Sequence, residues 1–553
     1  MYRNNLLLLL LFVSSLGWAN SPERTGFGRP FNFPLYLSGN FGELRSNHFH
    51  GGLDFKTQHQ SGKRLLALAD GYISRVQVTQ GSGYVLHVVY DNGFTTINRH
   101  LQGFVNPLAQ WVDSLQYAKE SWSIDETLEP NLHRVKQGEH IAWSGNMGYS
   151  FAPHLHLDVL ETESGDQIDP MPFFTKYLKD STPPRAQAVM LFPQPNSGVL
   201  NGSLNRESMN IPVRTKPKVW GLVGVGIKAY DYMDEVTNFY GVRQMELYVD
   251  GELTFKSIVD RFSAQESRYI NSWTYKKFMK AFIDPGNKLR MLAAYNDTRG
   301  LIRIDEEREY KLEFVLSDYF GNKSNYSLVL DGVKQEIPQI DLSSGYLLKW
   351  DTPNFFSRAG LDLSIPEGRL YTHTLLDFQV TPATEETVSP IYQLIDPSDY
   401  QPLHQWADLK LRVTKGEGID ENKFYIARVY RNNKFSSMGG RYKDGFIHTQ
   451  IRDLGTYTVA VDSIPPSIIP IQKDKWGARG EIRFKAEDKE TGIKSYKGTI
   501  DGQFVPFYLD IMPKVIRYKL DSKRVVKGKK HSLRLEVIDN CGNSTLIEEE
   551  FFW

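Results

Sequence analysis

Short alternations of hydrophobic and polar residues recur along most of the chain. Residues 84–90, for example, read YVLHVVY and run into the turn sequence Asp91-Asn92-Gly93. A period of two places successive side chains on opposite faces of a strand, and turns of this composition join antiparallel neighbours. The pattern predicts an all-β protein built mainly of antiparallel strands.

A different period occurs between residues 108 and 122. Apolar residues recur there every three or four positions, at Leu108, Trp111, Val112, Leu115, Ala118 and Trp122. This spacing predicts an amphipathic helix. Its apolar stripe either packs the helix on a neighbouring sheet or borders a substrate groove, and the sequence leaves both alternatives open.

Two distant segments share four landmarks in the same order. The landmarks are an entry with two prolines, a strand that ends in Asp, an Asp-Gly turn and a closing Gly-Asn turn. They begin at Asp180, Ile227, Tyr248 and Asp318 in one segment and at Asp462, Phe484, Thr499 and Asp539 in the other. Ordered repeats indicate related folding units, so we predict two β-sandwich modules that resemble immunoglobulin-like domains. The aspartates of these turns either close hairpins or ligate calcium.

The length of 553 residues suits several domains. We expect a first domain, an antiparallel sheet of barrel-like form, at residues 20–179. About three β-sandwich units follow it: residues 180–335 with an insertion around 256–288, residues 336–461, and residues 462–553.

The N-terminus has the pattern of an export signal. Arg3 precedes an apolar run at residues 6–13, and small residues lead to Ala19. The run is too short to span a bilayer, so we predict a secretory signal peptide at residues 1–19, with a retained anchor as the alternative. The predicted location is secreted or periplasmic in a bacterial envelope, with membrane contact during export alone.

Charge and cysteine content exclude two further possibilities. Lys and Arg (65) balance Asp and Glu (65), so no global field would hold the chain on nucleic acid or an anionic membrane surface. Cys541 is the single cysteine and cannot form an intramolecular disulfide. Binding must therefore come from local sites.

Histidines mark one such site. Nine of the 13 lie within residues 48–156, and histidine is the commonest metal ligand and general base. His154 and His156 are two apart, which on a strand directs both rings to one face. The paired glycines of His50-Gly51-Gly52-Leu53-Asp54 favour a turn that leads into a strand. Two histidines and a carboxylate are a donor set that suits zinc and leaves a fourth position for water.

The order of several motifs extends this interpretation. His-Gly-Gly-Leu-Asp at 50–54 is followed by Arg99-His100-Leu101, by Val135-Lys136-Gln137-Gly138 with the glycines of residues 141–148, and by Pro153-His154-Leu155-His156. This ordered set resembles the LytM/lysostaphin-type zinc endopeptidases, which carry H-x-G-x-D, a later H-L and a final H-L-H. The resemblance covers about residues 28–175.

The resemblance implies Zn²⁺ as the cofactor, with His50, Asp54 and His156 as its ligands. It also implies His100 and His154 as an unliganded catalytic pair. One of the two would act as general base and acid and the other would stabilise the oxyanion, and the sequence does not assign the two roles. We expect the remaining histidines to take no part.

Three departures from the family pattern lie close to these residues. Asn98 stands where the family often has Tyr, which removes a phenolic donor. The run before His154 is Ser150-Phe151-Ala152-Pro153, and Leu157-Asp158 replaces the common Phe-Glu. None of them removes a ligand or a catalytic histidine.

The leading prediction is a secreted zinc endopeptidase that acts on peptidoglycan cross-links or stem peptides, with the C-terminal modules binding envelope protein partners. Two alternatives are a non-catalytic wall-binding or regulatory scaffold and a metallopeptidase of other envelope proteins.

Overall fold

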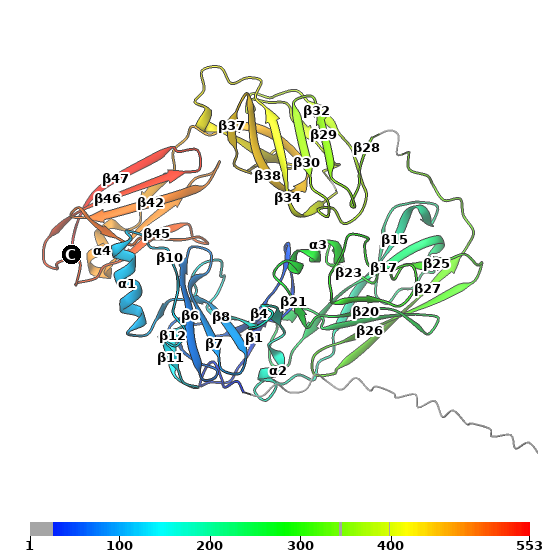
Figure 1. Cartoon of the computed structure of the whole chain (residues 1–553), viewed down its shortest axis with the longest axis horizontal. Coiled ribbons are helices and arrows are strands. Elements are labelled where there is room, and N and C mark those ends of the chain that lie inside the picture. Colours follow the sequence, from blue (N-terminus) through cyan, green and yellow to red (C-terminus); the bar gives the residue numbers. More distant parts are fainter. Residues whose placement is uncertain (1–25, 342–344, 398) are drawn as a thin grey trace, which may run out of the picture.

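The computed structural model describes residues 26–341, 345–397 and 399–553. The predicted signal peptide lies outside these residues. The chain is all-β, as predicted, and Figure 1 shows four β-rich units in a closed circuit, with the last unit beside α1 (Leu108–Ala118) of the first. The domain boundaries of the sequence analysis stay predictions.

The first unit consists of a large antiparallel sheet and a small one. The large sheet runs in the order β1 (Leu37–Gly39), β4 (Gly52–Lys56), β13 (His154–Glu161), β8 (Phe94–Leu101), β7 (Gly83–Tyr90), β6 (Gly71–Thr79) and β10 (Ile124–Thr127). The small sheet contains β5 (Arg64–Leu66), β12 (His140–Trp143) and β9 (Gly103–Phe104). Alternate residues such as Phe55, Leu155 and Leu157 are fully buried in the core of this unit, while the side chains between them face the site described below.

The predicted helix is present but shorter than its apolar stripe. α1 ends at Ala118, because Glu120 adopts a left-handed conformation (φ 44°) and Ser121 N donates to Gln116 O. Leu108 and Val112 are buried in the core of the first unit. The apolar stripe therefore packs the helix on the neighbouring sheet, the first of the two alternatives. Trp122 lies beyond the helix and still reaches that core.

The second unit is built on one large sheet. Its strands follow the order β16 (Glu207–Asn210), β15 (Arg185–Leu200), β17 (Lys218–Tyr232), β27 (Lys323–Gly332), β26 (Glu309–Ser317), β19 (Gln244–Val249), β20 (Glu252–Ile258) and β24 (Leu292–Ala294). The chain between β20 and β24 packs against the first unit: β21 (Arg261–Phe262) pairs with β14 (Gln167–Ile168), and the rings of Phe262 and Trp273 surround Phe49. This insertion therefore joins the two units.

The third unit is formed by two five-stranded sheets around a common core. One sheet contains β29 (Asn354–Arg358), β30 (Leu361–Ile365), β34 (Gln401–Arg412), β38 (Phe446–Leu454) and β37 (Arg441–Lys443); the other contains β32 (Gln379–Thr381), β33 (Ile391–Gln393), β39 (Thr456–Val461), β35 (Phe424–Val429) and β36 (Phe435–Ser437). Leu363 and Leu409 from the first sheet meet Ile426 and Val459 from the second.

The fourth unit has the same two-layer construction with four strands in each sheet. The sheets are β40 (Ser467–Pro470), β41 (Glu481–Glu487), β45 (Val515–Lys519) and β44 (Tyr508–Asp510), and β43 (Gln503–Val505), β42 (Ile493–Ile500), β46 (Lys530–Asp539) and β47 (Ser544–Phe552). Phe484 on one sheet and Leu533 and Leu535 on the other are buried between the layers.

Aromatic contacts close the circuit between the fourth unit and the first. The ring of Trp122 stacks on Tyr508 at a centroid distance of 5.4 Å, and the hydroxyls of Tyr117 and Tyr518 are 3.2 Å apart. The Arg524 guanidinium lies 4.0 Å from the centre of the Tyr117 ring. The α1 segment thus packs on its own sheet and also contacts the fourth unit.

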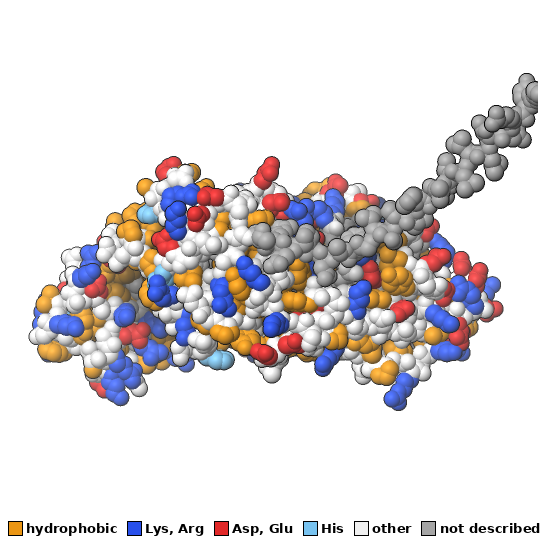
Figure 2. Space-filling view, turned by 90° about the horizontal axis from the view of Figure 1, so that it is seen from below, with side chains coloured by type: hydrophobic (Ala, Val, Ile, Leu, Met, Phe, Trp, Pro, Cys, Tyr) orange, Lys and Arg blue, Asp and Glu red, His pale blue; other side chains and the backbone are white. Residues whose placement is uncertain are grey.

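The surface carries both charge signs. Figure 2 shows Lys and Arg side chains interspersed with Asp and Glu over the face seen there, in keeping with the balanced composition. None of the helices in the described ranges is long and apolar enough to cross a membrane.

Candidate metal centre and active site

Two neighbouring strands bring together the three residues predicted as metal ligands. β4 and β13 pair so that Asp54 lies directly opposite His156, and His50 stands in the turn that precedes β4. His50 Nε2 is 3.0 Å from both Asp54 Oδ1 and His156 Nδ1, and the last two atoms are 2.9 Å apart. Donor atoms about 3 Å from one another fit a single zinc ion, whose bonds to nitrogen and oxygen are about 2.0–2.2 Å.

In His50 and His156, the ring nitrogen that points away from the other donors already makes a hydrogen bond. His50 Nδ1 donates to the Asn40 carbonyl at 2.6 Å, and His156 Nε2 donates to Asp158 Oδ1 at 2.6 Å. These bonds leave a lone pair on each inner nitrogen, so that two lone pairs and the Asp54 carboxylate converge. These atoms repel one another unless a cation, either a proton on one of the rings or a metal ion, lies between them. The donor set therefore fits a metal ion.

The electrostatics of the site also favour positive charge. Burial opposes ionisation of His156, but the Asp158 and Asp54 carboxylates outweigh it and raise the pKa of His156 to about 10. Burial likewise opposes the charged form of Asp54, yet His50 and His156 hold the pKa of its carboxyl well below the usual range. A cation bound here would meet an ionised carboxylate at neutral pH.

Glycines allow the strands around this site to approach closely. A Cβ atom on Gly52 would lie 2.1 Å from the carbonyl oxygen of Leu157 on β13, and one on Gly39 would lie 2.7 Å from Asp54 Oδ2. The first clash is with backbone, which cannot move aside cheaply. Gly52 thus serves the packing of β4 on β13 in addition to the turn.

The predicted catalytic histidines stand beside the three donors. The rings of His100 and His154 have centroids 4.8 Å apart, and His154 Nε2 is 3.6 Å from Asp54 Oδ1. Each Nδ1 donates to a carbonyl at 2.8 Å, His100 to Met147 and His154 to Ala152. This leaves both Nε2 atoms as acceptors.

Burial keeps this pair uncharged at neutral pH. Burial and then the neighbouring His154 lower the pKa of His100 to about 4, and burial lowers the pKa of His154 as well. His100 also has φ 61°, a left-handed conformation that is uncommon for a side chain of this size and that occurs at functional sites.

The residues at which the sequence departs from the family pattern have clear positions. Asp158 is 1% exposed and accepts from both His156 and Arg99 Nε (3.1 Å), so it orients a predicted ligand. Asn98 donates to Leu86 O and Thr96 Oγ1 within the sheet. Ser150 Oγ is 3.1 Å from His154 Nδ1. Asn40 was not predicted, because a backbone carbonyl acceptor leaves no signal in the sequence.

Other histidines of the region have structural surroundings. His87 Nε2 is 3.1 Å from Gln77 Oε1, and burial lowers the pKa of His87 to about 4. His140 packs edge-on against Trp143 at 4.3 Å. His48 Nδ1 donates to Ser46 O at 2.9 Å. That these histidines take no part in the reaction stays a prediction.

Two groups of carboxylates outside the first unit have donors close enough for an ion. They are Asp180, Asp231 and Asp318, and Asp462, Asp488 and Asp539, each with one oxygen per residue within 4.8 Å of the others. They are the equivalent landmarks of the two copies seen in the sequence. Burial, then Asp318 and Asp180, raises the pKa of Asp231 to about 9, and burial raises that of Asp180 to about 7.

Comparison with known proteins agrees with the motif order in the first unit. Over 163 residues the chain is 29% identical to glycyl-glycine endopeptidase ALE-1 of Staphylococcus capitis, a match that covers 29% of this chain and 35% of that protein. The first unit resembles the LytM/lysostaphin-type peptidases. The chain spans about a third of the length of this relative. Residues 345–462, in the third unit, match the family model described as a Zu5-like domain.

Two solved structures are similar to part of this chain. The lysostaphin catalytic domain of Staphylococcus simulans is 23% identical, with 25% of this chain and 89% of that chain covered and a TM-score of 0.18. A zinc-containing peptidase of Vibrio cholerae is 23% identical, with 26% and 40% covered and a TM-score of 0.19. Both matches cover about a quarter of this chain.

Proposed function

We propose that the chain is a zinc endopeptidase exported through residues 1–19, which hydrolyses peptide bonds of peptidoglycan cross-links or stem peptides. The observation that carries the proposal is the convergence of one ring nitrogen or carboxylate oxygen from each of His50, Asp54 and His156 beside the rings of His100 and His154. Similarity to a glycyl-glycine endopeptidase supports the substrate class.

His50, Asp54 and His156 would hold the ion. When bound, zinc supplies a Lewis acid for the scissile carbonyl and lowers the pKa of water toward neutrality. His154 or His100 accepts a proton from the attacking water at Nε2 and returns it to the leaving amine. The second histidine of the pair becomes a donor to the developing oxyanion once its Nε2 has taken up a proton and the ring is a cation. Met147 O and Ala152 O hold the two rings in the required tautomer.

A short loop next to this pair offers a surface for the peptide. Phe151 and Tyr149 are 90% and 67% exposed, and the same loop carries the carbonyls of Met147 and Ala152. Exposed aromatic side chains at the rim of a site commonly pack against a ligand. We propose that they contact the substrate backbone on one side of the scissile bond, and that the third and fourth units bind envelope proteins.

The proposal is tested by incubating the zinc-loaded chain with cross-linked peptidoglycan and identifying the released muropeptides by mass spectrometry. We expect cross-linked species to shorten, with new termini that identify the bond. The His154→Ala variant serves as the matched control, since it removes a predicted base while the three predicted ligands remain. If the zinc-loaded wild type leaves every muropeptide intact but binds peptidoglycan, the chain is a binding scaffold. If it cleaves an unstructured protein instead, the substrate class is wrong.

A further inference from the structure

The aspartate cluster of the second unit stands at its junction with the first. Asp180 lies in the connection that enters β15, Asp231 is near the end of β17, and Asp318 follows β26 directly. One carboxylate oxygen from each lies within 4.8 Å of the others. Three carboxyl groups are therefore held together by three separate parts of the fold.

One member of this cluster has an unsatisfied oxygen. Asp231 is 6% exposed, and its Oδ1 atom has no hydrogen-bond partner among the described residues. In contrast, Asp180 Oδ1 accepts from Thr182 N at 2.9 Å, and Asp318 accepts from Asn322 N at 2.9 Å and Nδ2 at 2.7 Å. A buried carboxylate oxygen without a donor is costly, and such an atom calls for an unseen partner.

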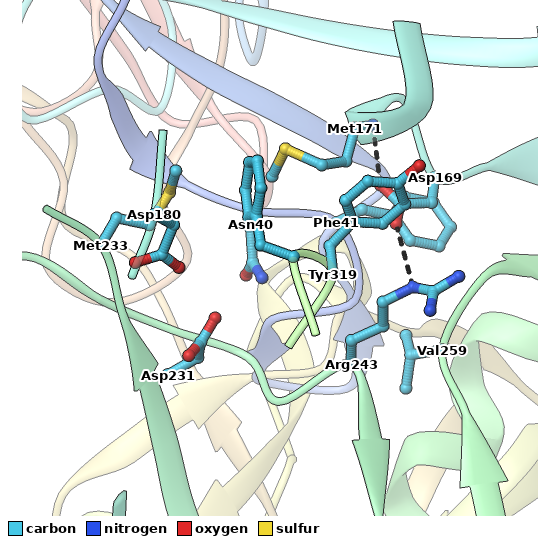
Figure 3. A pocket seen from close by; sticks show the side chains of 11 residues that line it. Asn40, Phe41, Asp169, Met171, Asp180, Asp231, Met233, Arg243, Val259 and Tyr319 are labelled. Carbon is cyan, nitrogen blue, oxygen red and sulfur yellow. Dashed lines mark hydrogen bonds and ion pairs between the residues drawn. The ribbon is translucent and has the colours of Figure 1, made fainter. Parts of the chain in front are cut away.

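A small cavity of about 20 Å³ adjoins the cluster, which is enough for about one water molecule or ion. Figure 3 shows the carboxylates of Asp180 and Asp231 facing each other at one end of this cavity. Asn40 also lines the cavity, and its carbonyl accepts the hydrogen bond from His50 Nδ1. The space thus extends from the second unit to the support of the candidate metal centre.

The equivalent cluster in the fourth unit is closed by protein donors. Thr491 Oγ1 donates to Asp462 Oδ2 at 2.6 Å, and Asp488 Oδ1 accepts from Thr491 N at 2.9 Å and Gly492 N at 2.6 Å. Asp539 accepts from Cys541 N and Asn543 N, both at 2.8 Å.

The clusters differ in the donors that surround the middle aspartate, Asp231 in the second unit and Asp488 in the fourth. Thr491 stands three residues after Asp488, and Asp234 stands three residues after Asp231. A carboxylate cannot donate, and Asp234 itself accepts from Ser181 N at 3.1 Å and Thr182 Oγ1 at 2.8 Å. The second unit therefore lacks the hydroxyl that serves Asp462 in the fourth, and within the described part of the chain Asp231 Oδ1 has no counterpart of the two backbone N–H groups that serve Asp488 Oδ1.

We propose that Asp180, Asp231 and Asp318 bind one calcium ion between the first and second units. An all-oxygen, carboxylate-rich set selects a hard cation, and calcium tolerates irregular geometry and completes six to eight ligands with water and carbonyl oxygens. The ion gives Asp231 Oδ1 its missing partner. The ion also holds the connection that carries Asp180 in place relative to Asn40, which lines the same cavity.

The experiment is a calcium titration of the full chain, first stripped of metal and then supplied with one equivalent of zinc. Isothermal titration calorimetry and thermal unfolding are measured for the wild type, for Asp231→Asn and for the matched variant Asp488→Asn. We expect one calcium site in the wild type, an upward shift of the unfolding midpoint by several degrees with calcium, and the same site in Asp488→Asn. Asp231→Asn should bind calcium roughly tenfold more weakly or worse.

The variant remains informative even though it removes a carboxyl group from the core. The amide that Asp231→Asn introduces can donate to the neighbouring carboxylates, so the variant is expected to unfold without calcium at or above the wild-type midpoint. Three results would overturn the proposal: a wild type that takes up no calcium at millimolar concentration, an unchanged affinity in Asp231→Asn, or an equal loss in Asp488→Asn. Tighter binding of magnesium than of calcium would overturn the choice of ion.

Discussion

The histidine site of the first unit and the aspartate cluster of the second gather acceptors in different ways. In the first, each ring nitrogen that points outward is bonded to an acceptor, Asn40 O for His50 and Asp158 for His156, and this fixes which nitrogen faces inward. In the second, either oxygen of a carboxylate can face an ion, so no hydrogen bond has to select one of them. The feature that points to a cation there is the oxygen of Asp231 that has no hydrogen-bond partner in the described ranges. Nitrogen-rich and all-oxygen sets thus predict two different ions, zinc and calcium, in adjoining units.

The largest expected effect distinguishes residues that bind the zinc ion from residues that act in catalysis. We expect His156→Ala to lose both zinc and peptidase activity, because it removes one of three donors, and His154→Ala to keep zinc while losing at least about 10³-fold in kcat/KM. Zinc content by mass spectrometry and muropeptide release are measured on the same samples. Loss of zinc from His154→Ala would show that this histidine is a ligand.

A second test addresses the support of His156. Asp158→Asn should weaken zinc binding by about 10–100-fold. The amide is a weaker acceptor for His156 Nε2, and it no longer offsets the positive charge of the bound zinc ion. Competition with a zinc chelator measures the change. The matched change Asp488→Asn in the fourth unit should leave zinc affinity as it is, and a loss there would mean that the assay reports folding and not the support of His156.

The third prediction uses the raised pKa of Asp231. Its folded-state pKa is about 9 and its unfolded value about 4, so the folded state holds the extra proton between these values. Without calcium, the stability of the second unit should therefore fall as pH rises from about 4 to 9, by at most about 1.4 kcal/mol per pH unit for this group.

Unfolding monitored by hydrogen exchange at pH 5 and pH 8 measures this slope. Calcium should flatten it, because the ion replaces the proton. A stability of the second unit that rises over the same range in calcium-free buffer would contradict the assignment to Asp231.

The smallest expected effect lies at the junction of the first and fourth units, where aromatic contacts are joined by the ion pairs Lys497–Glu120 and Arg524–Asp113. Arg524→Ala removes a guanidinium that lies 4.0 Å from the centre of the Tyr117 ring and 3.6 Å from Asp113 Oδ2, and it should cost about 0.5–1 kcal/mol of the docking free energy. Faster hydrogen exchange in α1, with unchanged exchange around β4 and β13, is the expected readout. Unchanged exchange in α1 would show that Trp122 and Tyr508 suffice for the contact.

Much of this organisation is readable in the sequence. Alternation predicts the strands, the 108–122 stripe predicts α1, and motif order selects His50, Asp54, His100, His154 and His156, which the structure brings side by side. Their roles as ligands and catalytic groups stay predictions. The repeated landmarks also predict that Asp180, Asp231 and Asp318 correspond to Asp462, Asp488 and Asp539.

What the sequence does not reveal depends on long-range geometry. The Asn40 carbonyl that orients His50 comes from the backbone, so residue type carries no trace of it. The end of α1 at Ala118 depends on Glu120 taking a left-handed conformation without a glycine. The contact of the insertion with Phe49 and the closure of the circuit at Tyr117 join segments hundreds of residues apart, and no local pattern encodes such pairings.

The most direct test of the central claim is an anomalous difference map at the zinc absorption edge, from crystals of the full chain grown with one equivalent of zinc and excess calcium. The account predicts one strong zinc peak among His50 Nε2, Asp54 Oδ1 and His156 Nδ1, and none among Asp180, Asp231 and Asp318. A zinc peak at the aspartates, or no peak between the two histidines, would contradict it.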